Sequence, residues 1–442
     1  MSEFKCEMNE ESPCLQSIRR LVSDRIIIWA FISACLQFSA AAPYFSQSVV
    51  TENAVSSKIE ELQIQSDRKI LVGGTRTSKG VDSFALARFL KDGAIDTTFG
   101  SGGNVSTVIG RSSKLFAVAL QPDGKIVAAG YSDTGKAHVV AIARYNPNGS
   151  LDTTFGSGGK VTTAAGGNYG RAFSVLIQAD GKILAAGHSN TTPRGFDLFL
   201  VRYNPDGSID KTFGRSGVVN APLGRENNGG QAAMLQKDGK IVAVGQMAAA
   251  GKRSMVAARF IPTGSLDTTF TSQGKVTIPA GKDSSASTLT LLGDAGILVG
   301  GYSNGPSVSE KIGEILLLDK NGGLDRSFAK AGRLTVQGAD INVLKVDGDS
   351  IIAAGNLGSN EDGACRAYQR VGRTGTLLAA AYITNEEDMC EISDLAIQSD
   401  GRILVTGSFG SFRNPDIALL RFNKDNTLDR SFGSNGTVIF EF

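Results

Sequence analysis

The stretch Leu120–Phe155 reads LQPDGKIVAAGYSDTGKAHVVAIARYNPNGSLDTTF, and close copies of it recur along the whole chain. Its first landmark is a polar turn followed by Ile and a run of small residues that ends in Gly. This Ile recurs every 52 to 58 residues, at positions 70, 126, 183, 241, 297, 351 and 403. Seven copies at a nearly fixed period predict a repeat architecture.

The second landmark closes each repeat with the pattern Leu/Ile-Asp-x-Thr/Ser-Phe. Six copies are intact: Ile95–Phe99, Leu151–Phe155, Ile209–Phe213, Leu266–Phe270, Leu324–Phe328 and Leu428–Phe432. The copy expected near Leu377 reads Leu-Leu-Ala-Ala-Ala and lacks both the Asp and the Phe. The sixth repeat is therefore the most divergent one.

Each repeat reads as four short strands. Asp123-Gly124 lies between two apolar runs and predicts a hairpin, because Gly accepts the positive φ that such a turn needs. The expected strands are Leu115–Gln121, Lys125–Gly130, Val139–Tyr145 and a fourth at Lys160–Thr163 or at Leu151–Phe155. No window has a helical period, and 54 Gly with only 11 Pro suit strands and tight turns.

Four strands repeated seven times predict an all-β fold, a seven-bladed β-propeller. One four-stranded sheet buries too little apolar surface alone, so the blades must pack against one another. An open β-solenoid is the second interpretation, and it is weaker because no segment that would cap its ends is evident.

The repeats resemble those of the bacterial delta-60 repeat family. The residues that carry the resemblance are the Gln-x-Asp-Gly-Lys-Ile turn and the stretch Asn204–Gly214, which reads NPDGSIDKTFG. The resemblance covers about residues 58–442. It implies a β-propeller and carries no catalytic motif with it.

The first 57 residues precede the propeller. Three Arg precede the apolar run Ile26–Leu36, which has the length of a signal-peptide core rather than of a membrane span. We expect residues 1–42 to be a signal peptide, with two alternatives: lipid modification at Cys35, or an uncleaved anchor. In either alternative this leader would be the only membrane contact. Residues 43–57 read as a lead-in with an extra copy of the fourth strand at Val49–Thr51. We expect residues 58–442 to form the propeller and the protein to be exported.

Cysteine usage agrees with export. Outside the leader only Cys365 and Cys390 remain, both in the sixth repeat or at its end. An oxidising compartment permits a disulfide between them, and two separate thiols are the alternative.

Motifs of catalysis are absent from the sequence. His138 and His188 are the only histidines, and no zinc, nucleophile-elbow or phosphate-loop motif occurs. The recurrent Asp of the hairpin turns is explained by turn geometry, which makes a calcium role unnecessary. We therefore predict no metal, no cofactor and no catalytic residue.

A second recurrent set of charges suggests structural ion pairs. Each third strand carries an Arg eight residues before the Asp of the second landmark, except that the fifth repeat has Leu317 and the sixth has Leu378 in place of the Asp. If each Arg bonds the Asp of the next blade, the missing Arg of the fifth repeat and the missing Asp of the sixth would belong to one pair, and no other charge would lack its partner. The predicted interblade pairs are Arg88–Asp152, Arg144–Asp210, Arg202–Asp267, Arg259–Asp325, Arg370–Asp429 and Arg421–Asp96, with an apolar contact between the two Leu.

The loops predict where a partner binds. In a meander the first–second and third–fourth turns share one face, and here these turns are nearly constant. The other face differs in every repeat, and repeat proteins place such variation on their binding side. It leans basic in the first four repeats and acidic in the sixth. The residue after each second-strand Gly should surround the channel mouth, and the candidate ligand contacts are Tyr131, His188, Gln246, Tyr302 and Asn356.

These observations predict an exported binding or scaffolding module, monomeric, whose partner is a protein, a glycan or an envelope component. The alternatives are a glycan lyase or hydrolase with a site at the channel mouth, and a purely structural surface protein. A net charge of +2 gives no support for nucleic-acid binding.

Overall fold

The computed structural model describes residues 56–192, 195–224, 228–271, 273–293, 296–305, 310–357, 365–383, 389–410 and 416–442. They belong to one compact unit, Glu52–Phe442. The expected signal peptide and the extra strand at Val49–Thr51 lie outside the described residues. The first strand begins at Ser56, two residues before the expected start of the propeller.

The described chain forms seven antiparallel sheets of four consecutive strands, which confirms the seven-bladed propeller. Blade 1 has β1 (Ser56–Ile64), β2 (Ile70–Ser78), β3 (Val81–Phe89) and β4 (Asn104–Thr107). Blade 2 has β5 (Ser112–Leu120), β6 (Ile126–Asp133), β7 (His138–Tyr145) and β8 (Lys160–Thr163). Blade 3 has β9 (Gly170–Ile177), β10 (Ile183–Thr192), β11 (Gly195–Tyr203) and β12 (Val218–Ala221).

The later blades follow the same order. Blade 4 has β13 (Gly229–Leu235), β14 (Ile241–Ala249), β15 (Lys252–Phe260) and β16 (Lys275–Thr277). Blade 5 has β17 (Lys282–Leu292), β18 (Gly296–Asn304), β19 (Lys311–Leu318) and β20 (Arg333–Gln337). Blade 6 has β21 (Asp340–Asp347), β22 (Ser350–Asn356), β23 (Cys365–Gly372) and β24 (Leu377–Ile383). Blade 7 has β25 (Met389–Ile397), β26 (Ile403–Gly410), β27 (Asp416–Phe422) and β28 (Thr437–Phe440).

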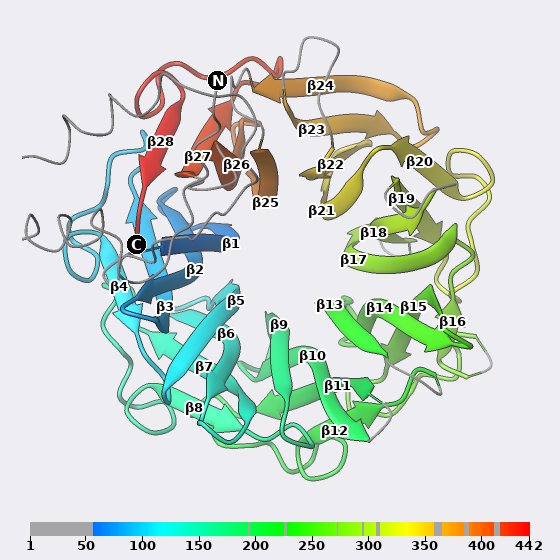
Figure 1. Ribbon diagram of the computed structural model, residues 1–442, viewed down its shortest axis with the longest axis horizontal. Coiled ribbons are helices and arrows are strands. Elements are labelled where there is room, and N and C mark those ends of the chain that lie inside the picture. Colours follow the sequence, from blue (N-terminus) through cyan, green and yellow to red (C-terminus); the bar gives the residue numbers. More distant parts are fainter. Residues whose placement is uncertain are drawn as a thin grey trace, which may run out of the picture. The chain divides into compact units, whose positions relative to one another are not determined.

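The first strand of each blade is the innermost one. Each first strand contacts the first strand of the next blade around the ring, from β1 through β25 and back to β1. Figure 1 shows these strands around the central opening and the fourth strands at the rim. Residues at the start of the first strands therefore lie at one mouth of the channel.

The two landmarks repeat because they build the core between blades. Seven apolar clusters occupy the seven interfaces between neighbouring blades. The landmark Ile is fully buried in all seven blades, and so is every Phe of the second landmark. Burial of such side chains stabilises the fold only when blades pack together, because a lone sheet would leave one face in water.

The ring closes through the C-terminal residue. The carbonyl of Phe442 accepts a hydrogen bond from Arg76 Nε at 2.7 Å, and its N–H donates to Ser57 Oγ at 3.2 Å. Phe440 packs edge-on against Phe89 of blade 1, with ring centroids 4.8 Å apart. In the described residues the last blade contains only C-terminal strands.

The repeated second-strand Gly has a steric cause. Every innermost strand contains a bulge, where one residue drops out of register with the second strand. A Cβ at Gly130 would lie 1.9 Å from the carbonyl oxygen of Lys114, two residues before the bulge residue of that strand. The bulge residues are Glu60, Phe116, Phe173, Gln231, Ser287, Asn342 and Ser393.

The predicted interblade ion pairs are wrong. The structure pairs five of the six Arg with the second-landmark Asp of their own blade, and Arg Nε lies 2.8 Å from the carboxylate in all five cases. The pairs are Arg88–Asp96, Arg144–Asp152, Arg202–Asp210, Arg259–Asp267 and Arg421–Asp429. The reason is local: the Asp152 N–H donates to the Arg144 carbonyl at 2.9 Å and folds the loop back onto its own strand.

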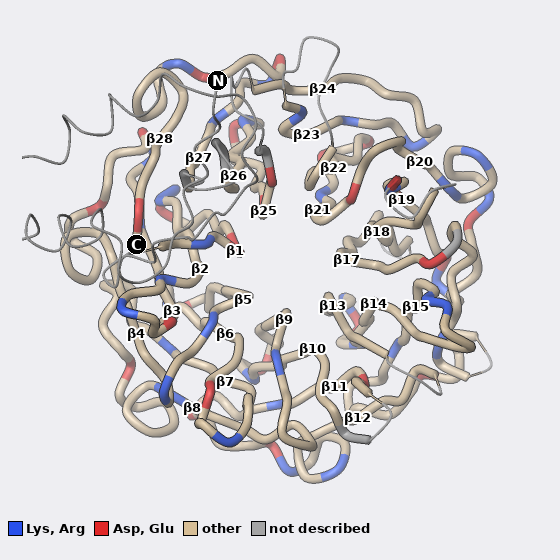
Figure 2. Tube along the Cα trace, in the orientation of Figure 1, with Lys and Arg blue, Asp and Glu red and all other residues tan. Residues whose placement is uncertain are grey.

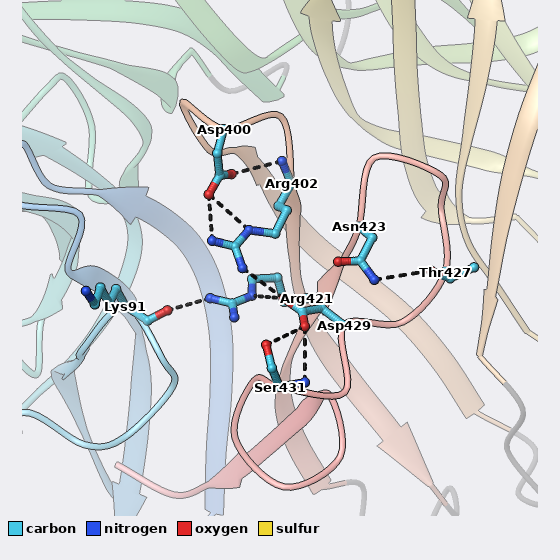
Figure 3. Close-up of polar contacts among 8 residues, drawn as sticks. All are labelled: Lys91, Asp400, Arg402, Arg421, Asn423, Thr427, Asp429 and Ser431. Atoms are coloured by element: carbon cyan, nitrogen blue, oxygen red, sulfur yellow. Dashed lines mark hydrogen bonds and ion pairs between the residues drawn. The ribbon is translucent and has the colours of Figure 1, made fainter.

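The same Arg does join neighbouring blades, but through a backbone carbonyl. Arg202 Nη1 donates to the carbonyl of Pro262 in blade 4 at 2.6 Å, and Arg421 Nη1 donates to that of Lys91 in blade 1 at 2.5 Å (Figure 3). Because a carbonyl is present at every position, this contact leaves no trace in the residue pattern.

Blade 5 lacks the Arg of this pair and blade 6 lacks the Asp, and the remaining charge has a different partner in each blade. Asp325 lacks the third-strand Arg because Leu317 takes its place, and its carboxylate accepts hydrogen bonds from Ser327. Arg370 turns to Asp347 at 2.5 Å. Leu317 is buried in the core between blades 5 and 6, whereas Leu378 is 57% exposed, so the coincident losses do not reflect one apolar contact.

The basic residue of the first hairpin turn also binds this Asp. Lys125 Nζ lies 3.2 Å from Asp152, and in blade 7 Arg402 takes the same place at 3.0 Å from Asp429. These contacts place the first–second and third–fourth turns on one face, as the meander requires. The constant face is constant because it carries this network.

Candidate functional site

The variable face carries a ring of seven residues, five of them charged, one strand further in than the predicted ligand contacts. The residue after each second-strand Gly pairs in register with a residue near the start of the innermost strand. These inner partners, from blade 1 to blade 7, are Lys58, Lys114, Arg171, Gly229, Ser285, Asp340 and Glu391. The ring is therefore basic over blades 1–3 and acidic over blades 6 and 7; Figure 2 marks the charged residues along the trace.

A pocket of about 340 Å³ lies on the basic side of this ring. Its lining comes from the innermost and second strands of blades 1 and 2 and from the innermost strand of blade 3. The lining residues are Ser56, Ser57, Lys58, Glu60, Thr75, Thr77, Lys114, Phe116, Tyr131 and Arg171. Of the five predicted ligand contacts, only Tyr131 lines this pocket.

Aromatic side chains of blades 2 and 3 form a closed circuit beside the pocket. Successive ring centroids lie 4.6 to 5.9 Å apart, as rings in favourable contact do. In order, its members are Tyr131, Phe116, Phe173, His188, Phe196, Tyr169 and His138. The circuit contains both histidines of the chain.

Arg171 is the cation within this circuit. Its guanidinium carbon lies 4.5 Å from the ring centroids of both Tyr131 and Tyr169. Arg171 Nη2 lies 3.5 Å from His138 Nδ1, and the buried Nε has no hydrogen-bond partner. Among the described residues no carboxylate lies within ion-pair distance of Arg171.

Blades 4 and 5 provide a contrast on the same face. Arg253 forms an ion pair with Asp283 at 2.7 Å. Lys311 lies over the ring of Tyr302 at 4.2 Å and binds Asp340 at 2.6 Å. The cations there are compensated by carboxylates, and Arg171 is compensated by aromatic rings alone.

The pKa shifts follow from burial beside this cation. Burial raises the pKa of Tyr131 and of Tyr169, and the charge of Arg171 offsets this only in part. Burial and the charge of Arg171 together lower the pKa of His188 to about 4, so His188 is neutral at pH 7. Burial raises the pKa of Glu60, which forms an ion pair with Lys58 at 2.9 Å.

A second group of charges joins blades 7 and 1 with a lysine of blade 6. Asp394 accepts a hydrogen bond from the Leu62 N–H at 2.9 Å, and Lys345 Nζ lies 3.5 Å from it. Burial raises the pKa of Glu61 well above its ordinary value, and the neighbouring charge of Asp394 raises it further. These contacts link three blades, which makes this group part of the ring closure.

The other predicted contacts do not gather at the pocket. His188 joins Tyr131 in the aromatic circuit, whereas Gln246, Tyr302 and Asn356 belong to blades 4, 5 and 6. The signal for the missed cations was present, because Ser-Ser-Lys occurs at both 56–58 and 112–114. These lysines line the pocket because they lie on the innermost strands, and the sequence does not show which strand of a blade is innermost.

Cys365 in β23 is disulfide-bonded. The side chain of its predicted partner, Cys390, lies outside the described residues, so that pairing stays a prediction. Within the described ranges, no group of three or more His, Cys, Asp and Glu side chains could hold a metal ion. The same residues contain no helix that is long and apolar enough to cross a membrane.

Solved structures with a similar fold have low sequence identity. A protein from Lactobacillus plantarum is 13% identical with a TM-score of 0.50, and the match covers 84% of this chain and 99% of that one. Virginiamycin B lyase from Staphylococcus aureus is 9% identical (TM-score 0.42; 72% and 83% covered). Sqt1 from Chaetomium thermophilum is 10% identical (TM-score 0.45; 86% and 84% covered). At these identities the likeness shows the fold alone.

No curated protein matches the sequence. Five stretches match the family model described as a domain of unknown function (DUF5122) beta-propeller: residues 65–99, 121–155, 178–213, 236–270 and 398–432. Each stretch runs from the first hairpin turn to the Phe of the second landmark, in blades 1–4 and 7. Five of the seven blades thus match a β-propeller repeat family.

Proposed function

We propose that this protein is an exported binding module that takes an anionic ligand in the pocket over blades 1–3. The observation that carries the proposal is Arg171, a cation that lines the pocket, is held between two tyrosine rings and has no carboxylate partner among the described residues. A guanidinium suits this role because its planar fork binds carboxylate, sulfate or phosphate with two parallel hydrogen bonds.

The site is arranged before any ligand arrives. Stacking on Tyr131 and Tyr169 restricts the long Arg171 side chain, so binding an anion costs little additional conformational entropy. Lys114 adds a second positive charge to the pocket, although Asp82 lies 3.4 Å from it. Glu60 forms its ion pair with Lys58 of blade 1, and Arg171 of blade 3 has no such pair among the described residues.

A glycan lyase or hydrolase is the second candidate, because Tyr131, His138 and Arg171 meet in one place. The pKa directions favour binding instead. A tyrosine base needs a lowered pKa, and burial raises that of Tyr131. His188 is neutral, but its Nδ1 is buried without a hydrogen-bond partner that would orient it. A purely structural role gives no reason for an uncompensated cation at a pocket.

Export, a monomeric state and a close relation to the delta-60 repeats remain parts of this proposal. The disulfide-bonded Cys365 supports an oxidising compartment. The near-zero net charge supports a discrete anionic ligand rather than nucleic acid.

The test is calorimetric titration of the full chain with small carboxylates, sulfate, acidic peptides and acidic oligosaccharides. Arg171→Ala should abolish the binding of any anion that the wild type binds. Arg111→Ala removes an equal charge from an exposed position of the same face outside the pocket and should leave binding intact. If the two variants behave alike, or if no anion binds, the proposal is refuted. Ligand cleavage detected by mass spectrometry would favour the enzyme.

A further inference from the structure

We infer that the ligand of this pocket is an acidic saccharide, whose carboxylate binds Arg171 while the face of a sugar ring lies against Phe116. The inference rests on the proposed anion-binding function and adds the class of ligand. Three features of the pocket carry it: an aromatic platform, one buried hydroxyl without a hydrogen-bond partner among the described residues, and an asymmetric distribution of charge.

The platform is specific to two blades. Phe116 and Phe173 occupy the bulge of the innermost strand, where the other five blades have Glu, Gln, Ser, Asn and Ser. Both rings are half-buried, and their centroids lie 4.8 Å apart across the boundary between blades 2 and 3. The fold therefore does not require aromatic residues here. A ring beside a cation suits a ligand that has both an apolar face and an anionic group.

Hydroxyl groups line the opposite side of the pocket. Ser56, Ser57, Thr75 and Thr77 all contribute to it. Thr75 is 5% exposed, and its Oγ1 has no hydrogen-bond partner. A buried hydroxyl without a partner is costly, and a ligand hydroxyl would satisfy it. A polyhydroxylated ligand matches this lining better than a peptide or an inorganic anion does.

Charge sets the orientation of the ligand. Lys58 and Glu60 neutralise each other on the blade 1 side, while Arg171 lies on the blade 3 side with no counter-ion in the part of the chain that the structure describes. The carboxylate should therefore lie toward blade 3, with the neutral hydroxyls toward blade 1. A volume of about 340 Å³ is at the lower end for ligand pockets, which suits one sugar unit or the end of a chain.

The test is titration of the full chain, by calorimetry, with trisaccharides of glucuronate, galacturonate and mannuronate, tested separately. Their methyl esters, a tri-glutamate peptide and inorganic sulfate serve as comparisons. At least one uronate should bind, and its ester should bind at least about tenfold more weakly, because a charged hydrogen bond is lost. Arg171→Ala should have a similar effect, and Arg111→Ala should change affinity less than about twofold.

Phe116→Ala tests the platform. It should weaken uronate binding at least about fivefold through lost ring contact and leave sulfate binding unchanged. Gln231→Ala changes the equivalent bulge residue of blade 4 and should leave both uronate binding and sulfate binding unchanged. The ester comparison uses the wild type, so it holds even if the Phe116 variant fails to fold.

The outcomes separate the two proposals. If tri-glutamate or sulfate binds in an Arg171-dependent manner and no uronate binds more tightly, the saccharide inference is overturned and the anion-binding function stands. If none of these anions binds, both fail. Equal affinity for a uronate and its ester also overturns the inference.

Discussion

Replacing Asp152 by asparagine removes one negative charge from the network on the constant face and changes almost nothing in shape. The Asp152 side chain is 5% exposed, and it accepts hydrogen bonds from Arg144 Nε at 2.8 Å and Lys125 Nζ at 3.2 Å. Asparagine can still accept the hydrogen bonds of Thr154. The substitution therefore removes the negative charge and, because the amide nitrogen takes the place of Oδ2, also the acceptor of Arg144 and Lys125.

The magnitude follows from what remains around Arg144. Removing one partner of a buried ion pair costs about 3–5 kcal/mol, because the other charge is left without compensation. Arg144 keeps its hydrogen bond to the Pro205 carbonyl and its position over the Phe155 ring. We therefore expect a loss near the lower end, about 3 kcal/mol of unfolding free energy.

Blade 5 supplies the matched control. Asp325 occupies the same place in its repeat, but Leu317 replaces the arginine, and the carboxylate accepts hydrogen bonds from Ser327. Asp325→Asn should cost less than about 0.5 kcal/mol. Urea denaturation of both variants by circular dichroism, with the slope compared to that of the wild type, measures the difference.

The pH dependence is a second readout of the same experiment. Burial opposes ionisation of Asp152, but hydrogen bonds from Thr154 and Lys125 and the charge of Arg144 outweigh it and lower the pKa. The unfolded state then binds more protons near pH 4, so this stabilisation is complete above the ordinary carboxyl pKa and is lost as the pH falls through the folded-state value. The gap between wild type and Asp152→Asn should narrow in acid. Equal destabilisation by the two substitutions at neutral pH would refute the reasoning.

Three further predictions concern the bulge and two titrating groups. Gly130→Ala should lower the free energy of unfolding by more than about 3 kcal/mol, because its Cβ would meet the Lys114 carbonyl. Gly158→Ala has nothing within 4 Å of its Cβ and should cost only about 1 kcal/mol of backbone strain. Similar losses of stability for the two variants in thermal denaturation would contradict this. Burial and a neighbouring carboxylate raise the pKa of Glu61, so the folded state binds more protons above pH 4.5 and stability should fall as the pH rises through the folded-state value. Glu61→Gln should remove that decline in melting temperature, and an unchanged slope would exclude the mechanism. The pKa of His188 is lowered to about 4, so stability should fall as the pH drops from 6.5 toward 4, and His188→Asn should flatten that profile; an NMR titration that places the pKa near 6.5 would contradict it.

The repeat, the blade count and the four strands of each blade could be predicted from the sequence. These features depend on signals within a few residues: alternation of apolar residues, the Asp-Gly turn, and a landmark that returns seven times. The fourth strand at Lys160–Thr163 was one of two sequence alternatives, and β8 spans those residues. The recurrent Gly of the second strand could also be seen in the sequence. The sequence did not show why this position requires Gly, which is the close approach of a carbonyl such as that of Lys114.

The partners of charged groups were decided by the tertiary structure. The coincident losses at Leu317 and Leu378 favoured pairs between blades, yet the backbone hydrogen bond from Asp152 to Arg144 closes the loop on its own strand. The pairing depends on this local geometry, and the contact that does cross to the next blade uses a carbonyl, which every residue possesses. A residue pattern cannot record such a contact.

The candidate site was even less accessible from the sequence. Tyr131 and His188 were predicted as ligand contacts, but Arg171 gains its meaning from rings that lie as far as 40 residues away in the chain. The local sequence pattern of each repeat determined that this chain forms seven similar blades. Which side chains share a pocket was decided only when the innermost strands met around the channel, because a closed ring brings together residues from different blades that no local pattern relates.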